Sequence, residues 1–184
     1  IVDPAKGIEI SLPMSCGIRQ VNCFYAPFFS AEPVRMGAFT GSVKEGGPVN
    51  FFNIRMNVHG NGTHTECSGH IYDNGKNVNK ILQRHFFRCT LLSAYPTKQE
   101  NGDLVIEEST LKILLEGQCS ETICLRTMPN DSGKRERKYS GTNPAYLGKD
   151  AAEYLVSLGV KHLLIDLPSV DREEDGGKLE SHRA

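Results

Sequence analysis

The second half of the chain alternates between segments typical of helices and segments typical of buried strands, and this order restricts the fold more than any other feature. Residues 107–117 (EESTLKILLEG) predict a helix, and the apolar segment 121–127 (ETICLRT) predicts a buried strand. Residues 143–159 predict the next helix, which Gly159 stops, and the chain runs directly into an apolar strand at 160–171. Helix, short loop and buried strand in alternation indicate α/β layering.

The first third of the chain is rich in glycine, proline and residues that favour strands. Short strands are predicted within 8–14, 20–29 and 49–60, and the uninterrupted apolar centre of 86–96 predicts a strand buried on both faces. We therefore expect a mixed sheet with flanking helices, in one α/β domain over residues 1–184. The chain lacks an initial methionine and ends abruptly, so both ends look trimmed and the C-terminal end in particular looks truncated.

Composition excludes several classes of partner. The formal net charge is −1 and the pI is about 6.7, which gives no basic surface for nucleic acid or an anionic membrane. The one basic run, 133–139, is interpreted as a solvated loop. No apolar stretch approaches the ~20 residues that cross a bilayer, and no signal peptide is evident. The six cysteines form no C-x-x-C pair, which favours reduced thiols and a cytoplasmic location.

One polar segment, HGNGTHTECSGH at 59–70, concentrates the residues that can do chemistry. If residues 57–66 are extended, His64 and Glu66 share a face, because side chains two apart on a strand point the same way. His70 would return after a turn. Imidazole and carboxylate donors suit Zn²⁺ or Mn²⁺, and a metal with an open position lowers the pKa of bound water to about 7.

Spacing alone leaves alternatives open. The pattern matches neither a zinc finger nor the helical H-E-x-x-H frame, so the histidines could simply be hydrogen-bonded in a polar loop. Cys67 could be a thiolate nucleophile with His64 or His70 as its base, a soft metal ligand, or an inert buried thiol.

Four segments, in order, resemble the cyclase-like metal-dependent hydrolases, a family that includes arylformamidases (kynurenine formamidases) and isatin hydrolases. GTHTECSGH is similar to the family signature H-x-G-T-H-x-D-x-P-x-H, and EISLPM to its opening D-[IL]-S-x-P-[LM]. Downstream, ICLRT resembles the strand that ends in Arg-Thr, and AAEYLVSLGVKHLLIDLPSVD resembles the late helix and strand. The resemblance implies a swivelling β/β/α fold and a homo-oligomer, most simply a homodimer.

The resemblance also implies a ligand set. His64, Glu66 and His70 match the second histidine, the aspartate and the last histidine of the signature, and His182 matches a late histidine. These residues would hold one or two Zn²⁺ or Mn²⁺ ions, and a further glutamate of the family pattern would lie beyond Ala184.

Three departures from the family pattern affect this ligand set. The first histidine of the signature is replaced by Gly60, and His59 could take its place only if the strand bulges. Glu66 replaces aspartate, which moves the carboxylate by roughly 1.5 Å at constant backbone. Cys67 begins a segment that lacks the proline of the signature.

Other residues receive supporting roles. The N-terminal region supplies contacts to aromatic substrates in the resemblance, so three aromatic residues are candidates for a substrate pocket: Phe24, Tyr25 and Phe28. Asp166 and Asp171 could orient ligand histidines, because metal-bound imidazoles usually donate their other N–H to a carboxylate or carbonyl; strand-end capping explains both equally well. His85 and His162 are interpreted as structural.

The expected activity is hydrolysis of an aryl or cyclic amide by attack of metal-activated water. The substrate would be a small molecule, with an N-formylkynurenine-like formamide of tryptophan catabolism the leading class. His70 or His182 would relay protons to the leaving nitrogen. Two alternatives are a catalytically silent binding or structural protein on the same scaffold, and a metal-assisted cyclase or dehydratase.

Overall fold

The protein is a mixed α/β chain with several small sheets, as its sequence predicts. The computed structural model describes residues 3–116 and 119–184. Within this described part, no helix has the length and apolar character needed to cross a lipid bilayer. The swivelling β/β/α arrangement stays a prediction.

The described residues group into two compact units. The first unit contains the chain up to His64 together with Arg135–Lys138, and the second contains Thr65–Lys134 and Tyr139–Ala184. The grouping follows the density of contacts and does not test the prediction of a single domain. One boundary falls inside the segment HGNGTHTECSGH, directly after His64.

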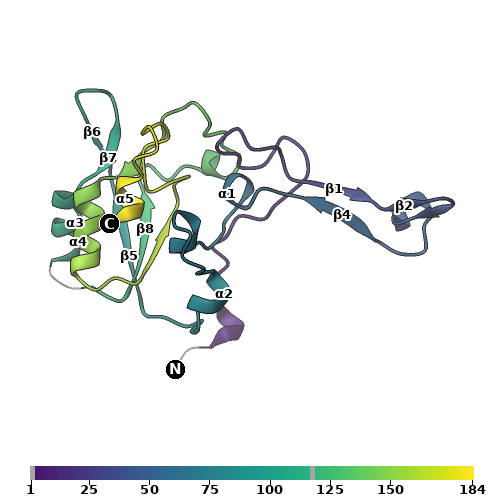
Figure 1. Cartoon of the computed structure of the whole chain (residues 1–184), viewed down its shortest axis with the longest axis horizontal. Coiled ribbons are helices and arrows are strands. Elements are labelled where there is room, and N and C mark those ends of the chain that lie inside the picture. The colour runs from purple at the N-terminus through teal and green to yellow at the C-terminus, as the bar shows by residue number, and fades with distance from the viewer. Residues whose placement is uncertain (1–2, 117–118) are drawn as a thin grey trace. The chain divides into compact units, whose positions relative to one another are not determined.

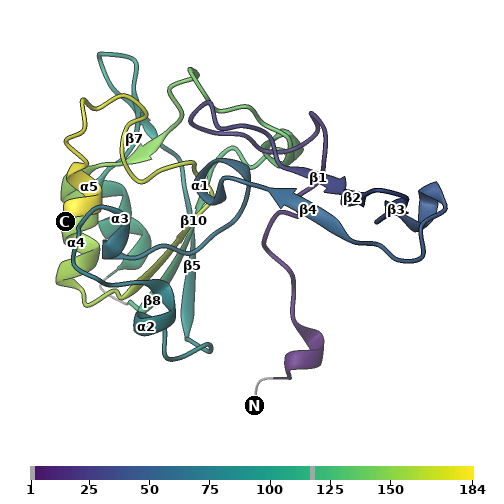
Figure 2. The same ribbon diagram turned by 45° about the vertical axis from the view of Figure 1, so that its right-hand side comes forward.

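A three-stranded parallel sheet organises the second unit. Its strands are β5 (Cys89–Ala94), β8 (Thr122–Thr127) and β10 (His162–Ile165), with β8 in the centre. The helices α3 (Glu108–Leu115) and α4 (Lys149–Ser157) pack against each other beside this sheet (Figure 1). Figure 2 shows the three strands side by side. The alternation predicted for the second half is thereby confirmed.

The core of the second unit lies between this sheet and the two helices. Leu111 and Leu115 of α3 are almost completely buried because they recur on the helix face that meets the sheet. The other core residues are Leu92, Ala94, Ile106, Ile123, Leu125, Leu147, Ala151, Ala152 and Leu155. Leu91 of β5 is 59% exposed. The prediction that this strand is buried on both faces is therefore wrong, because only one of its faces meets the helices.

A second small sheet and two short helices complete this unit. The sheet has the order β6 (Thr97–Lys98), β7 (Leu104–Ile106) and β9 (Tyr146–Leu147). The helices are α2 (Val78–Ile81) and α5 (Glu180–Arg183).

Across both units, short 3₁₀ helices occur at Pro4–Lys6, Val43–Glu45, Ser68–His70 and Ser132–Arg135.

The helix predicted at 143–159 begins later than expected, at Lys149. Residues Tyr146–Leu147 form β9 instead, and the Leu147 amide donates to the Val170 carbonyl at 3.0 Å. Leu147 is also buried. Tertiary pairing and burial therefore override the local helix pattern at this end. The helix predicted at 107–117 is confirmed as α3, and Gly117 lies outside the described residues.

Asp103, in the turn between β6 and β7, is a buried charge with several partners. Its carboxylate accepts hydrogen bonds from four side chains: Asn143 (2.8 Å), Tyr146 (3.0 Å), Arg172 (3.0 Å) and Asn101 (3.0 Å). The hydrogen bond from Asn143, followed by those from Arg172 and Tyr146, lowers the pKa of Asp103 although burial opposes the shift. This carboxylate ties the loop that carries Arg172 to the β6–β7 turn.

We expect Asp103→Asn to destabilise the protein at pH 7 by about 2 kcal/mol, the scale of a hydrogen bond to a charged group. The ionised carboxylate stabilises the folded protein at pH values above its unfolded-state pKa of about 3.9. This contribution is lost as the pH falls through the lower pKa of the folded state. The difference in unfolding free energy between wild type and variant should therefore become smaller below about pH 4. Urea denaturation from pH 7 to pH 3 measures this gap.

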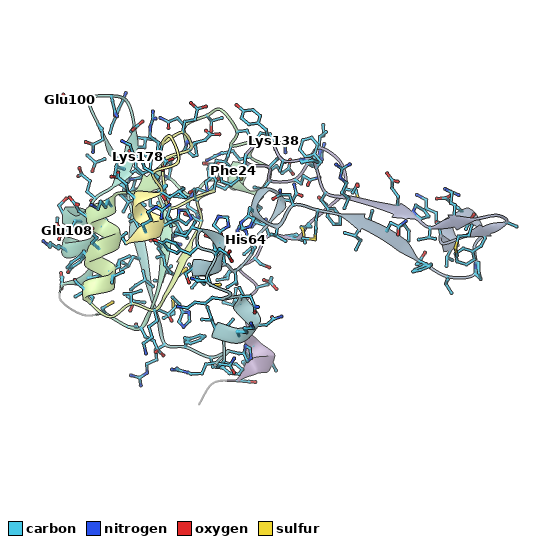
Figure 3. The ribbon with its side chains drawn as sticks, viewed as in Figure 1. Phe24, His64, Glu100, Glu108, Lys138 and Lys178 are labelled. Atoms are coloured by element: carbon cyan, nitrogen blue, oxygen red, sulfur yellow. The ribbon has the colours of Figure 1, made fainter. Side chains whose placement is uncertain are left out.

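The control for that experiment is Glu100→Gln, at the exposed tip of the same β6–β7 turn (Figure 3). It removes a carboxylate without disturbing the buried network, so its unfolding free energy should follow that of the wild type at each pH. A gap for Asp103→Asn that stays constant with pH would contradict a role for the ionised carboxylate.

The first unit contains a two-stranded hairpin and a single helical turn. Strand β1 (Ser30–Pro33) pairs antiparallel with β4 (Phe52–Arg55), and β2 (Arg35–Met36) pairs with β3 (Phe39–Thr40) farther along the same arm (Figures 1 and 2). The helical turn is α1 (Val58–Asn61).

Strands predicted at 8–14 and 20–29 are absent from the described structure of these segments. Some of their backbone amides bond to nearby side chains instead of to a partner strand. The Ser11 amide donates to the Glu9 carboxylate at 2.9 Å, and the Phe29 amide donates to the Gln20 side-chain oxygen at 3.0 Å. Side-chain hydrogen bonds of this kind compete with sheet ladders. The strand predicted within 49–60 is confirmed as β4.

The basic run at 133–139 is engaged in contacts inside each unit. In the second unit, the Lys134 ammonium donates to the Asp166 carboxylate at 2.8 Å, and only 13% of its side chain is exposed. In the first unit, the Lys138 ammonium donates to the Gln20 carbonyl and lies 5.6 Å from the centre of the Phe28 ring. Two charges of the run thus stabilise loops, and Lys134 is far less solvated than the sequence suggested.

Candidate metal centre

Three side chains of the second unit converge on one point: Glu66, His70 and His182. One ligand atom from each lies within 4.8 Å of the others. The Nε2 atom of His182 is 3.3 Å from Oε1 of Glu66, and Nε2 of His70 is 3.7 Å from Oε2 of the same carboxylate. The sequence places His182 more than a hundred residues away from the other two, so only the fold brings the three together.

Local backbone structure places Glu66 two residues before the short turn that carries His70. Residues Ser68–His70 form a 3₁₀ helix in which the His70 amide donates to the Cys67 carbonyl at 2.8 Å. A Cβ atom at Gly69 would lie 2.0 Å from the Lys76 carbonyl oxygen, so this turn requires glycine. The predicted turn before His70 is therefore real, and its tightness depends on Gly69.

Asp171 builds the other half of the group. Its carboxylate accepts hydrogen bonds from the backbone amides of Ser181 (2.7 Å) and His182 (3.2 Å) at the start of α5. The same carboxylate accepts a 2.5 Å hydrogen bond from Nδ1 of the His182 ring. Because a carboxylate only accepts, Nδ1 carries the proton, and Nε2 faces Glu66. The alternative role for Asp171, orienting a histidine, is the one that the contacts support.

Asp166 has a different set of partners. Its carboxylate accepts from the Thr127 amide at 2.9 Å and from Lys134 at 2.8 Å, which joins the ends of β8 and β10. Capping at a strand end accounts for these contacts. His162 lies against Phe87, with ring centres 4.2 Å apart, as a structural histidine would.

Two carboxylates act on the His182 ring. The hydrogen bond to Glu66 is the largest influence and raises the pKa of His182, and Asp171 raises the pKa further, whereas burial lowers it. In the absence of a cation, both carboxylates therefore favour the doubly protonated form of the ring. A cation bound at Nε2 would take the place of one proton and leave the bond to Asp171 intact.

The first unit holds a histidine pair of its own, His59 and His64. Nδ1 of His59 is 3.1 Å from Nε2 of His64, and Nδ1 of His64 is 3.0 Å from the Gly62 carbonyl oxygen. Since a carbonyl only accepts, Nδ1 of His64 carries its proton and Nε2 is the acceptor for His59. Figure 3 labels His64, which lies just beyond α1 in the chain.

The helical turn α1 corrects the prediction that residues 57–66 are extended. The Asn57 side chain caps this turn by accepting from the Gly60 amide at 2.9 Å. The coil of the turn, and no strand bulge, brings His59 beside His64. The inference that His64 and Glu66 share one face of a strand loses its premise, because this segment is not a strand.

The glycine at position 60 is explained by packing. A Cβ atom there would lie 2.3 Å from the Ala26 Cβ atom and 3.0 Å from the Cys23 carbonyl oxygen. The Gly60 carbonyl also accepts from the Cys23 amide at 3.0 Å. The backbone of α1 is thus pressed against residues 23–26, and a histidine side chain has no room at this position.

Two of the three candidate aromatic residues, Phe24 and Tyr25, lie within 23–26, and Phe28 follows shortly after. Phe24 and Tyr25 both adopt left-handed backbone conformations, with φ of 56° and 52°. Phe24 and Phe28 are just over 40% exposed and Tyr25 is 76% exposed, so none of them belongs to the core of the first unit. Consecutive left-handed residues are strained, and such strain persists only where the surroundings hold it. Here the contact with Gly60 holds the turn.

The family of the chain follows from a comparison with known proteins. A family model described as "Putative cyclase" matches residues 8–172. The chain belongs to this cyclase family. A search of curated proteins found no match.

A solved structure resembles this cyclase-family chain in fold. It is described as a predicted metal-dependent hydrolase from Bacillus stearothermophilus, with 16% sequence identity and a TM-score of 0.53. The similarity covers 94% of this chain and 78% of the other. At this level of identity, the likeness establishes a cyclase-like fold.

The donor atoms of this cyclase-family chain suit a borderline divalent cation. Nitrogen and oxygen donors bound about 2.0–2.1 Å from a tetrahedral Zn²⁺ are roughly 3.3 Å apart. The separations are 3.3 and 3.7 Å around Glu66 and 3.1 Å between His59 and His64. Cys67 belongs to the turn before His70, and its thiol is not part of the Glu66–His70–His182 group.

Some residues around the group carry no sequence signal that would have identified them. Tyr72 and Arg183 are chain neighbours of the ligand candidates His70 and His182, and the Arg183 guanidinium carbon lies 5.3 Å from the centre of the Tyr72 ring. Asp103 holds Arg172, which follows Asp171 directly. Each acts through a partner distant in sequence, so no local motif marks it.

Proposed function

We propose that this cyclase-family protein is a metal-dependent hydrolase of aryl amides, with aryl formamides such as N-formylkynurenine as the leading substrate class. The observation that carries the proposal is the arrangement of Asp171, His182 and Glu66. An imidazole held at Nδ1 by a buried carboxylate, with Nε2 turned toward a second carboxylate, is the usual environment of a metal-binding histidine.

Glu66, His70 and His182 would hold a Zn²⁺ or Mn²⁺ ion. His64 matches the second histidine of the family signature, and we propose His64 and its partner His59 as further ligands. When bound, such an ion supplies Lewis-acid chemistry, in that it polarises a carbonyl and makes water more acidic.

The side chains then have separable tasks. Asp171 fixes the tautomer and the orientation of His182, so His182 is committed to holding the cation. Nε2 of His70 lies 3.7 Å from the Glu66 carboxylate, and 37% of the His70 side chain is exposed. We assign to His70 the transfer of a proton to the leaving nitrogen of the amide, a task for which imidazole is suited near neutral pH.

The aromatic turn at Phe24 and Tyr25 supports the choice of an aryl substrate. Exposed aromatic rings on a strained, anchored turn can stack on a substrate ring at little cost in ordering. The turn is anchored to α1, the element that carries His59. Phe28 lies under Lys138 and is thereby less available for stacking on a substrate.

The test is metal-dependent turnover. Protein stripped with a chelator should be inactive toward an aryl formamide and regain activity with Zn²⁺ or Mn²⁺, and elemental analysis should give about one ion or more per chain. Phe24→Ala and Tyr25→Ala should raise KM for the aryl formamide and leave KM for an aliphatic formamide unchanged. Protein that takes up no metal would instead support the catalytically silent alternative.

A further inference from the structure

Helix α5 is too short to set the position of His182 by itself. It has four residues, Glu180–Arg183, whereas isolated helices shorter than about 12 residues are marginal in water. Leu179, before its first residue, has a left-handed φ of 50°. The location of His182 in the second unit therefore depends on the side-chain contacts that anchor this single turn.

Two hydrogen-bonded contacts attach α5 to elements other than the turn that carries His70. The Asp171 carboxylate binds the first amides of the helix, as described above. The Ser181 hydroxyl donates to the Leu147 carbonyl at 2.8 Å, which attaches α5 to β9. Neither contact determines how far α5 lies from the turn that carries Glu66 and His70.

A third contact reaches that turn without using a ligand side chain. The Arg183 guanidinium lies over the ring of Tyr72, 5.3 Å from its centre. Its Nε donates to the Lys178 carbonyl at 3.0 Å, which fixes the direction of the guanidinium. The Tyr72 amide donates to the Ser68 carbonyl at 2.9 Å, which fixes Tyr72 on the Ser68–His70 turn.

We infer that Arg183 and Tyr72 form a positioning pair that sets the distance between His182 and the Glu66–His70 turn, and thereby the affinity for the metal. This inference rests on the proposed function. Arg183 follows His182 directly and Tyr72 is two residues beyond His70, so each partner shares a rigid turn with one ligand. A cation over an aromatic face is attracted by the ring quadrupole, and the attraction is specific to a ring.

The experiment compares Zn²⁺ affinity, measured by competition with a chromophoric chelator, in Arg183→Ala, Tyr72→Ala, the double variant and Tyr72→Phe. At the usual strength of an exposed cation–π contact, each alanine variant should bind Zn²⁺ about two- to fivefold more weakly. The double variant should be no weaker than the worse single variant, and Tyr72→Phe should bind like the wild type because phenylalanine keeps the ring. Equal affinity in all variants would overturn the inference.

Lys112→Ala is the matched control. Lys112 lies 5.5 Å from the centre of the Tyr154 ring, so it makes the same kind of contact in the same unit between α3 and α4. Zn²⁺ affinity should not change in this variant. A loss equal to that of Arg183→Ala would show a general effect of stability and overturn the inference.

A second measurement separates this inference from the proposed function. If wild type binds no Zn²⁺, the proposed function fails. Hydrogen exchange of the metal-free protein then tests whether Arg183 and Tyr72 still position α5. The amides of Ser181 and His182 should exchange faster in Arg183→Ala and Tyr72→Ala than in wild type and Tyr72→Phe. Unchanged exchange in both alanine variants would overturn the pair.

Discussion

Glu66→Gln is expected to lose at least about 100-fold in Zn²⁺ affinity, and activity with it. Loss of a residue that only orients a ligand already costs roughly 10- to 100-fold, and a direct ligand should cost no less. Glu66 contacts both His70 and His182, so the substitution removes the negative charge at the centre of the group. Chelator competition and elemental analysis measure the loss.

The matched control is Glu180→Gln, which removes an exposed carboxylate from the first residue of α5 and should retain full Zn²⁺ affinity. Glu66→Asp separates charge from reach. It keeps the charge and shortens the side chain by about 1.5 Å, so it should bind more tightly than Glu66→Gln. Metal content in Glu66→Gln equal to that of wild type would exclude this carboxylate as a ligand.

Gly60→His, which restores the first histidine of the family signature, is expected to weaken the site. The new Cβ atom would lie 2.3 Å from the Cβ atom of Ala26 and 3.0 Å from the carbonyl oxygen of Cys23. Overpacking of this kind costs about 1–3 kcal/mol, and here the new atom meets a Cβ atom and a carbonyl oxygen, which cannot move without the backbone. The helical turn α1 should separate from residues 23–26 and His59 should lose its contact with His64. Urea denaturation gives the stability loss.

Gly62→Ala is the control for a glycine in the same segment. Its new Cβ atom would approach the Met14 Cγ atom at 3.1 Å, and a flexible methionine side chain can adjust. Stability should change little in this variant and clearly in Gly60→His. A stable Gly60→His protein with higher Zn²⁺ affinity would contradict our account of position 60.

The second half of the chain was predictable because its signals are local and agree with one another. Helix α3 and strands β8 and β10 formed where apolar spacing and glycine stops indicated. The first third was less predictable. Residues 8–29 have strand-like composition, but a strand requires a partner along its length, and several backbone amides of this segment bond to its own side chains instead.

The candidate site was likewise predictable from the sequence only in part. Residue types and spacing indicated His64, Glu66 and His70 as candidate ligands, and the resemblance to a hydrolase family added His182; these ligand assignments stay predictions. The register of His59 was not predictable, because it depends on a helical turn capped by Asn57 and packed against Ala26. An alternating pattern gives no sign of such a turn.

The amino-acid sequence by itself determined the α/β order of the second half, the family and the residue types of a candidate metal centre. Only the tertiary structure decided that Asp171 holds His182, that Glu66 lies between two histidines, and that Gly60 leaves no room for a side chain. The physical reason is sequence separation. Helix periodicity and ligand types are properties of neighbouring residues, whereas these contacts join residues far apart in the chain and exist only after the chain has packed.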